Sequence, residues 1–336
     1  MGSARTRSSG VHGFSLVEML LSVVLGALIV LATVSVFLSG RRTMAMGDAL
    51  SRTQESTRTA FELVSRDLRE AGANPCSSSL QYGNVLNARA SAWWADFNAG
   101  LRGYTGSQAT LGTPFGAALG QRIAGTPAFD VHMATAGAAG ETSVTVKMAQ
   151  GSAPLDVRAN AAFQTGDIAV VCDTVAGYVF QITGAPGAKI PHASGSGSPG
   201  NCAADFTSEF VTCNGSGTGY LFASDASVAK TAHARWYIGS DGRGGRSLFR
   251  AEMVNRGASA TPTQIVPAEV SKDVSALAIG YLLVGSSDFV DAAAVTDWRQ
   301  VRAVQLRFTL SSEVVGQTER IARSSTQVVA LRNRTP

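Results

Sequence analysis

Residues 13–42 read GFSLVEMLLSVVLGALIVLATVSVFLSGRR, and this stretch decides how the rest of the chain is organised. From Met19 to Leu38 it holds no charge and no proline, and its few polar side chains are hydroxyls. An α-helix of that length rises roughly 30 Å, which matches the hydrocarbon thickness of a bilayer. The stretch therefore predicts a helix that can span a membrane.

Glu18 does not suit a plain apolar anchor. It lies one turn inside the apolar run, where an unpaired carboxylate carries a large free-energy cost. The leader before it carries Arg5, Arg7 and His12 and no acid. We therefore expect Glu18 to have a cationic partner.

The run GFSLVE at residues 13–18 resembles the cleavage and methylation signature of the type IV pilin and type II pseudopilin family. The resemblance implies that a prepilin peptidase cuts between Gly13 and Phe14 on the cytoplasmic side and methylates the new N-terminus. The cut creates an α-amino cation one helical turn from Glu18. In a filament, that amine and the Glu18 carboxylate of a neighbouring subunit can neutralise each other in a medium of low dielectric constant.

An ordinary signal peptide or signal anchor is the alternative interpretation of this stretch. A secretory signal peptide has its small-residue cleavage site after the apolar region, and this region is longer than a typical one. The small residues around Gly26 and Gly40 do not make a convincing site. A plain anchor explains the apolar length but leaves Gly13 and Glu18 as coincidences.

The helical pattern continues beyond the basic pair Arg41-Arg42 and becomes amphipathic. Gly72 followed by Asn74-Pro75 supplies a stop signal. The pattern predicts one helix from Phe14 to Ala71, about 87 Å long if unbroken, whose second half docks on a sheet through an apolar stripe. The stripe consists of Leu50, Thr57, Phe61, Val64 and Leu68, while Arg52, Glu55, Arg58, Glu62, Arg66, Asp67, Arg69 and Glu70 are assigned to the other faces.

Three further segments carry the resemblance. Residues 62–72, ELVSRDLREAG, resemble the helix end of the larger minor pilins and pseudopilins of the PilW and GspJ kind. Residues 298–304, WRQVRAV, and 328–334, VVALRNR, resemble the terminal strands of PilW-type proteins. One departure is that the membrane segment lacks the proline that many major pilins carry in its second half.

The resemblance implies a minor pilin that works by interaction rather than catalysis. Its expected partners are the prepilin peptidase, the inner membrane, other minor pilins, the major pilin and a tip adhesin, in a priming or tip complex. It implies an inner-membrane protein with a cytoplasmic N-terminus and a periplasmic body, which later joins the pilus at the cell surface. The alternatives are a type II secretion pseudopilin and, outside the family, a signal-anchored periplasmic enzyme or receptor.

Composition agrees with a β-rich body behind the helix. The chain has 336 residues, of which 45% are hydrophobic, 15% are charged and 36 are glycines, a balance that suggests many turns. Removing Arg5 and Arg7 with the leader lowers the formal charge from +4 to +2. So small a charge, without clustered basic and aromatic residues, gives no support for nucleic-acid binding.

All four cysteines, Cys76, Cys172, Cys202 and Cys213, follow the membrane segment, as disulfides of an extracytoplasmic body require. Three connectivities are open. The short loop favours Cys202 with Cys213, which leaves Cys76 with Cys172. A zinc site is the rival interpretation, but no Cys-x-x-Cys or Cys/His spacing is present, and we expect no metal or cofactor.

The body shows strand patterns mainly in its second half. Residues 74–140 read as a long connection with short elements and scattered aromatic anchors, and 184–200 as an exposed loop. A hairpin is expected where two strands flank the glycine-rich turn 239–245, in which Asp241 is read as a turn residue rather than a calcium ligand. The predicted strands cover 143–148, 167–172, 177–182, 233–238, 247–252, 274–284, 301–310 and 326–332.

No catalytic constellation is visible in the sequence, and we expect no enzyme activity. There is no Gly-x-Ser-x-Gly elbow, no His-Glu-x-x-His helix and no phosphate loop. His132, His192 and His233 fall in unrelated contexts, and each is interpreted as a surface or strand residue. The expected fold is α+β and pilin-like, with a long N-terminal helix packed on an antiparallel sheet. The expected segments are the leader 1–13, the membrane or filament-core helix 14–40, the amphipathic helix 41–73 and the extracytoplasmic domain 74–336.

Overall fold

The computed structural model divides the chain into two compact units. One unit comprises residues 1–52 with 313–321, and the other comprises 53–312 with 322–336. The long helix α1, Leu16–Glu70, contributes its first part to the first unit and its second part to the other. The described residues are 13, 15–77, 80–87, 89, 92–95, 97, 99–135, 140–158, 161–195, 197–206, 213, 219–255, 263–272, 274–313 and 320–334.

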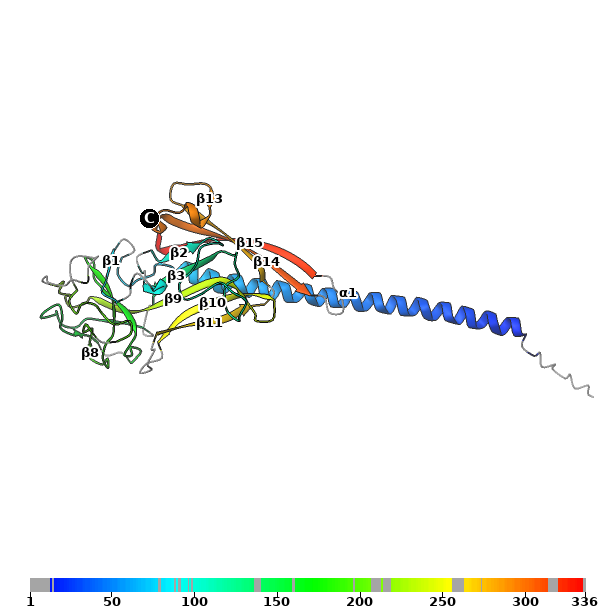
Figure 1. Cartoon of the computed structure of the whole chain (residues 1–336), viewed down its shortest axis with the longest axis horizontal. Coiled ribbons are helices and arrows are strands. Elements are labelled where there is room, and N and C mark those ends of the chain that lie inside the picture. The colour runs from blue at the N-terminus through cyan, green and yellow to red at the C-terminus, as the bar shows by residue number, and fades with distance from the viewer. Residues whose placement is uncertain are drawn as a thin grey trace, which may run out of the picture. The chain divides into compact units, whose positions relative to one another are not determined.

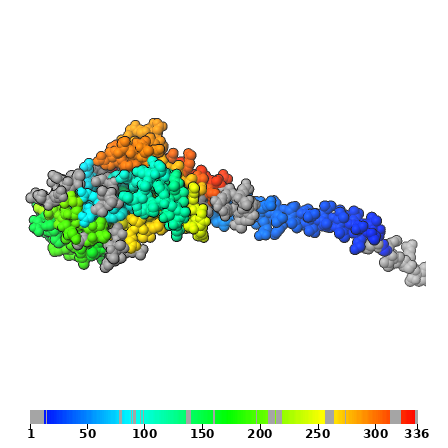
Figure 2. Space-filling model, viewed as in Figure 1, coloured from blue at the N-terminus to red at the C-terminus, as the bar shows by residue number. Residues whose placement is uncertain are grey.

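From Leu16 to Leu38, the first part of α1 exposes its apolar side chains on every face. Leu20, Leu28 and Phe37 are each more than half exposed, as are most of their apolar neighbours. Figure 2 shows these turns in dark blue as a column of uncovered side chains. The described part of the chain contains this one helix long and apolar enough to cross a membrane.

The helix ends where the sequence predicted. Its last residue is Glu70, the Ala71 amide donates to the Leu68 carbonyl, and Gly72 adopts a left-handed φ of 71° that a side chain would disfavour. The Gly72 amide then donates to the His132 carbonyl at 2.8 Å. A backbone hydrogen bond therefore connects the residue that ends the helix to the body.

The long strand β9, Ser227–Ser240, organises the larger sheet, which has nine strands in the described part of the chain. Its first residues pair with β4 and β6, and its later residues pair with β3 and β10, all antiparallel. The other strands join outside these four. Those nearest β9 are β3 Ala128–Ala134, β4 Glu141–Ser143, β6 Ile168–Cys172 and β10 Arg246–Asn255; farther out are β1 Tyr82–Asn84, β2 Leu101–Tyr104, β7 Gly177–Gln181 and β11 Thr263–Ser271.

A smaller sheet has the order β13-β12-β14-β15, and β5 pairs separately with β8. Because β1 runs parallel to β7, the larger sheet is mixed, which corrects the prediction of a purely antiparallel body. The strands of the smaller sheet are β12 Val274–Leu283, β13 Phe289–Val290, β14 Val301–Glu313 and β15 Arg320–Ala330; β5 is Leu155–Asp156 and β8 is Lys189–Ile190. Short 3-10 helices are η1 Trp93–Ala95, η2 Ala292–Ala294, η3 Trp298–Gln300 and η4 Arg332–Arg334.

The second part of α1 lies between the two sheets (Figure 1). Its stripe contacts residues of both, and the rings of Phe61 and Phe308 meet edge to face with centroids 4.8 Å apart. Val64 and Leu68 are fully buried. Burial of side chains of this size stabilises a fold by roughly 1.5–3 kcal/mol each, so this stripe holds helix and sheets together.

Two further hydrophobic clusters cover the two faces of the β6–β7 pair. On one face Tyr178 and Phe180 pack with Phe206 and Phe222. On the other face the strands meet Tyr82, Trp93, Trp94 and Phe97, all buried. The aromatic residues of the 74–140 segment therefore anchor it to the body, as predicted.

Most predicted strands are confirmed, and three predictions are wrong in part. The connection 74–140 contains β1 and β2, which are short elements as expected, but also the seven-residue strand β3, which was not expected. Of the expected strand 143–148, only Ser143 lies in a strand, and Val146 is exposed. The expected loop 184–200 contains the two-residue strand β8.

Candidate functional site

The N-terminal site begins just before α1. Gly13 and Ser15 are exposed and outside the helix, and Glu18 lies in its first turn. Phe14, the other half of the predicted cleavage site, lies outside the described residues, as does most of the leader. An acid in the first turn suits the positive end of the helix dipole, which explains part of the tolerance for Glu18.

Glu18 is surrounded by exposed apolar side chains. Val17 and Met19 flank it, and both are about two-thirds exposed or more. Within the part of the chain that the structure describes, no basic side chain lies within ion-pair distance of its carboxylate. The carboxylate is thus available to a group outside the described residues.

The hydroxyls of the apolar segment bond to the helix itself. Ser22 Oγ donates to the Glu18 carbonyl at 2.7 Å, Thr33 Oγ1 to Val30 at 2.8 Å and Ser35 Oγ to Ala32 at 2.8 Å. Such bonds satisfy a hydroxyl without an outside partner. Glu18 is therefore the main polar irregularity on an otherwise apolar surface.

A second acid on the same helix, Asp67, is buried. Its Oδ2 accepts from Trp236 Nε1 at 2.9 Å and from Arg250 Nε at 2.6 Å. Arg250 also pairs with Glu252. The sequence assigned Asp67 to a polar face, and this was wrong because two partners on β9 and β10 reach it.

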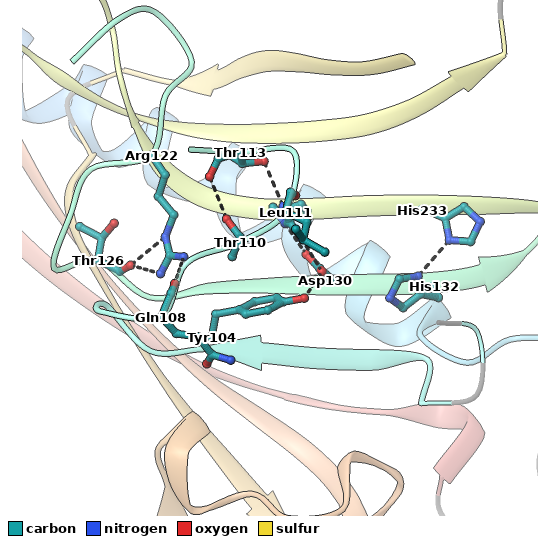
Figure 3. Close-up of polar contacts among 11 residues, drawn as sticks. Tyr104, Gln108, Thr110, Leu111, Thr113, Arg122, Thr126, Asp130, His132 and His233 are labelled. Carbon is teal, nitrogen blue, oxygen red and sulfur yellow. Dashed lines mark hydrogen bonds and ion pairs between the residues drawn. The ribbon is translucent and has the colours of Figure 1, made fainter. Parts of the chain in front are cut away.

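The body contains a buried ion pair that the sequence did not reveal, and Figure 3 shows its acid, Asp130, with the hydroxyl of Tyr104 directed at it. Arg235 on β9 donates from Nε and Nη2 to the two carboxylate oxygens of Asp130 on β3, at 2.7 and 2.8 Å, and Tyr104 donates its hydroxyl to Asp130 at 2.7 Å. Burial raises the pKa of Asp130, and the hydrogen bonds from Arg235 oppose that rise. Burial lowers the pKa of Arg235, but Asp130 outweighs it and the net pKa is raised.

Arg122 organises the loop between β2 and β3. Its guanidinium donates to the carbonyls of Thr126, Gln108 and Thr105 at 3.0, 2.9 and 2.6 Å, and it lies 4.9 Å from the Phe115 ring centroid. Burial lowers its pKa to about 10, so it stays charged at neutral pH. Its hydrogen bonds therefore hold the carbonyls of this loop together.

The three body histidines are all buried, and two of them meet. His132 and His233 lie on strands, one of the two placements expected, whereas His192 is neither on the surface nor in a strand, which corrects its interpretation. His132 and His233 occupy opposite positions on β3 and β9, with their Nδ1 atoms 2.9 Å apart. His192 lies elsewhere, with Nε2 2.9 Å from the Ala153 carbonyl. The signal for the pair was present, because Asp130 and His132 alternate on one strand as His233 and Arg235 do on the other, which places polar groups on shared faces.

The disulfides join Cys76 to Cys172 and Cys202 to Cys213, the connectivity that the short loop favoured. Arg89 Nη1 donates to the sulfurs of Cys202 and Cys213. Asp241 accepts from the amides of Arg243 and Gly245, so it is a turn residue as predicted. Across the described residues, no three His, Cys, Asp or Glu side chains gather as metal ligands.

The polar groups of the body and those of the N-terminal site differ in where their partners lie. In the body, the polar clusters bond to one another and link strands, whereas the N-terminal site presents one acid and an apolar surface outward. The N-terminal site is thus suited to association. Comparisons with protein-family models, with curated proteins and with solved structures return no match.

Proposed function

We propose that this chain is a minor pilin of a type IV pilus, of the PilW type. A prepilin peptidase would cut it after Gly13 and methylate Phe14. The helix would span the inner membrane with its N-terminus in the cytoplasm and the body in the periplasm, and would then enter the filament core. The body would meet other minor pilins, the major pilin and a tip adhesin in a priming or tip complex.

The observation that carries the proposal is the position of Glu18. Its carboxylate stands one turn from the proposed new N-terminus, on an exposed apolar helix, without a basic partner in the described part of the chain. A new α-amino group on a neighbouring subunit supplies the missing cation. Neutralisation between subunits would make helix packing in an apolar core favourable only when the subunits are in register.

The direct test is the N-terminus of the mature protein. Mass spectrometry of the chain purified from membranes should give a first residue of N-methylated Phe14, and a Gly13→Leu variant should retain its leader. An intact Met1 would leave a signal-anchored protein, and cleavage near Gly40 would leave a body without its anchor; either result would reject the proposal.

A type II secretion pseudopilin is a second candidate, because residues 62–72 resemble both kinds of protein. The two machines differ in what is lost when the gene is deleted. Loss of surface pili with normal protein secretion supports the minor pilin, and the reverse result supports the pseudopilin. Restoring the gene on a plasmid is the control.

A further inference from the structure

The rings of His132 and His233 face each other through their Nδ1 atoms (Figure 3). With Thr231, they form a directional chain of hydrogen bonds. Thr231 Oγ1 donates to the Ile168 carbonyl, so it accepts from His233 Nε2, which lies 2.8 Å away. His233 therefore carries its proton on Nε2, and its bare Nδ1 accepts from the Nδ1–H of His132. The two rings are neutral and in opposite tautomers.

This chain can accept one proton but not two. A first proton can add to Nε2 of His132 and leave every bond of the chain in place. A second proton, on His233, places an N–H on each of two Nδ1 atoms that are 2.9 Å apart. Two donors cannot bond to each other, and two cations repel at this distance, so the rings must separate.

The charged groups around the pair are cationic or already engaged. Arg235 on β9 and Arg102 on β2 face it, and Asp130 on β3 is bound to Arg235. Burial, reinforced by these two guanidinium groups, lowers the pKa of His132 to about 3. Burial and the neighbouring His132 lower the pKa of His233 well below its usual range. The pair is therefore neutral at pH 7 and takes up protons only in acid.

The cover over the rings is η1, whose residues Trp93, Trp94 and Ala95 do not titrate. The Trp93 ring lies 6.1 Å from His132 and the Trp94 ring 6.3 Å from His233, measured between centroids. Strand β2 follows η1 along the chain and pairs with β3. On the N-terminal side of η1, the Cys76–Cys172 disulfide ties the chain to β6.

We propose that His132 and His233 form an acid-sensitive latch, in which double protonation drives the rings apart and releases η1 from the sheet while the Cys76–Cys172 disulfide keeps the segment attached. The latch is independent of the proposed filament function. Its effect is to expose the two tryptophans of η1 in acid without unfolding the body.

The test is hydrogen exchange of the full-length protein in detergent micelles, measured by mass spectrometry from pH 7 to pH 3 and corrected for the chemical exchange rate. A peptide covering residues 92–104 should lose protection before one from β14. Its opening constant should rise up to about a hundredfold per pH unit where two protons bind. Loss of protection in both peptides together, or none in residues 92–104, would overturn the latch.

Two variants separate the pair from general acid effects. In His132→Asn the side-chain amide can still donate to His233 Nδ1, but one titrating ring is gone, so the rise should fall to at most about tenfold per pH unit. His233→Gln tests the other ring in the same way. His192→Asn, at a buried histidine without a histidine partner, is the matched control and should keep the wild-type profile. A wild-type profile in either folded pair variant rejects the latch; if neither folds at pH 7, the wild-type result decides.

Discussion

The two acids Glu18 and Asp67 lie on one helix but differ in burial and in partners. Asp67 is buried and bonds to Trp236 and Arg250 of the same chain. Glu18 is exposed among apolar side chains, and the described residues provide it with no basic partner. The acid in the second part of α1 thus finds its partners within the chain, whereas the acid in the first part needs a partner outside the described residues.

The difference follows from what surrounds each half of the helix. Between two sheets, a carboxylate is tolerated because fixed donors replace water. On an uncovered apolar helix the same group can be satisfied only by lipid headgroups, by water or by another molecule. Truncating side chains in the second half of the helix should therefore affect folding, whereas truncating Glu18 in the first half should affect association.

Asp67→Ala should have the largest effect on the body. It leaves the Trp236 N–H and the largely buried Arg250 without their shared acceptor, and the free energy of unfolding should fall by about 4 kcal/mol. Chemical denaturation in detergent, followed by tryptophan fluorescence, measures the change. Glu62→Ala, an exposed acid on the same helix, is the control and should stay within about 0.5 kcal/mol. Equal losses in the two variants would show that the buried bonds contribute nothing.

Leu68→Ala should rank next. Leu68 is fully buried between the sheets, and its truncation should lower the free energy of unfolding by about 3 kcal/mol through lost burial and a cavity. Leu28→Ala, in the exposed first half, should leave the same measurement unchanged within about 0.5 kcal/mol. A large loss from Leu28→Ala in the isolated, detergent-solubilised chain would contradict the division of the helix.

A smaller contrast is offered by two serines. Ser65 is buried and donates to Gln327 on β15 at 3.4 Å, so Ser65→Ala should cost about 1 kcal/mol. Ser22→Ala removes only a bond to the helix's own backbone and should be neutral in the same denaturation assay. If Ser22→Ala proves the more damaging variant, the first half of the helix is not as self-contained as its bonds indicate.

Glu18→Ala should leave the unfolding of the body unchanged yet reduce assembly most. The more apolar segment should insert into the membrane normally, while incorporation into filaments should drop at least about tenfold because the neighbouring amine loses its counter-ion. Immunoblots of sheared filaments against whole membranes give the ratio. Glu55→Ala is the matched control, and normal incorporation of Glu18→Ala would contradict charge pairing between subunits.

The helix and the later strands could be predicted because their patterns are local. The stop at Gly72 and the alternation of Val304, Leu306 and Phe308 require no knowledge of distant residues, and both are confirmed. The same holds for the hairpin of β9 and β10, whose turn is set by glycines at positive φ.

The alternation of polar residues on each strand was visible, but which buried polar groups meet could not be predicted because the partners lie far along the chain. Asp130 and His132 fall in the segment 74–140, which read as a long connection, and their partners Arg235 and His233 on β9 lie 105 and 101 residues later. Asp67 meets Trp236 across 169 residues. The proposed cleavage site was inferred from sequence alone, since Phe14 lies outside the described residues.

The shared strand β9 has a consequence for how the body folds. Strands β3, β4 and β6 all precede β9 in the chain, and each pairs with it. Because a ribosome or an export channel delivers residues from the N-terminus onward, these earlier segments must wait, unpaired along that edge, until residue 240 has emerged. Such non-local pairing slows folding and produces aggregation-prone intermediates. Until β9 has emerged, the edges of β3, β4 and β6 that pair with it stay open to aggregation.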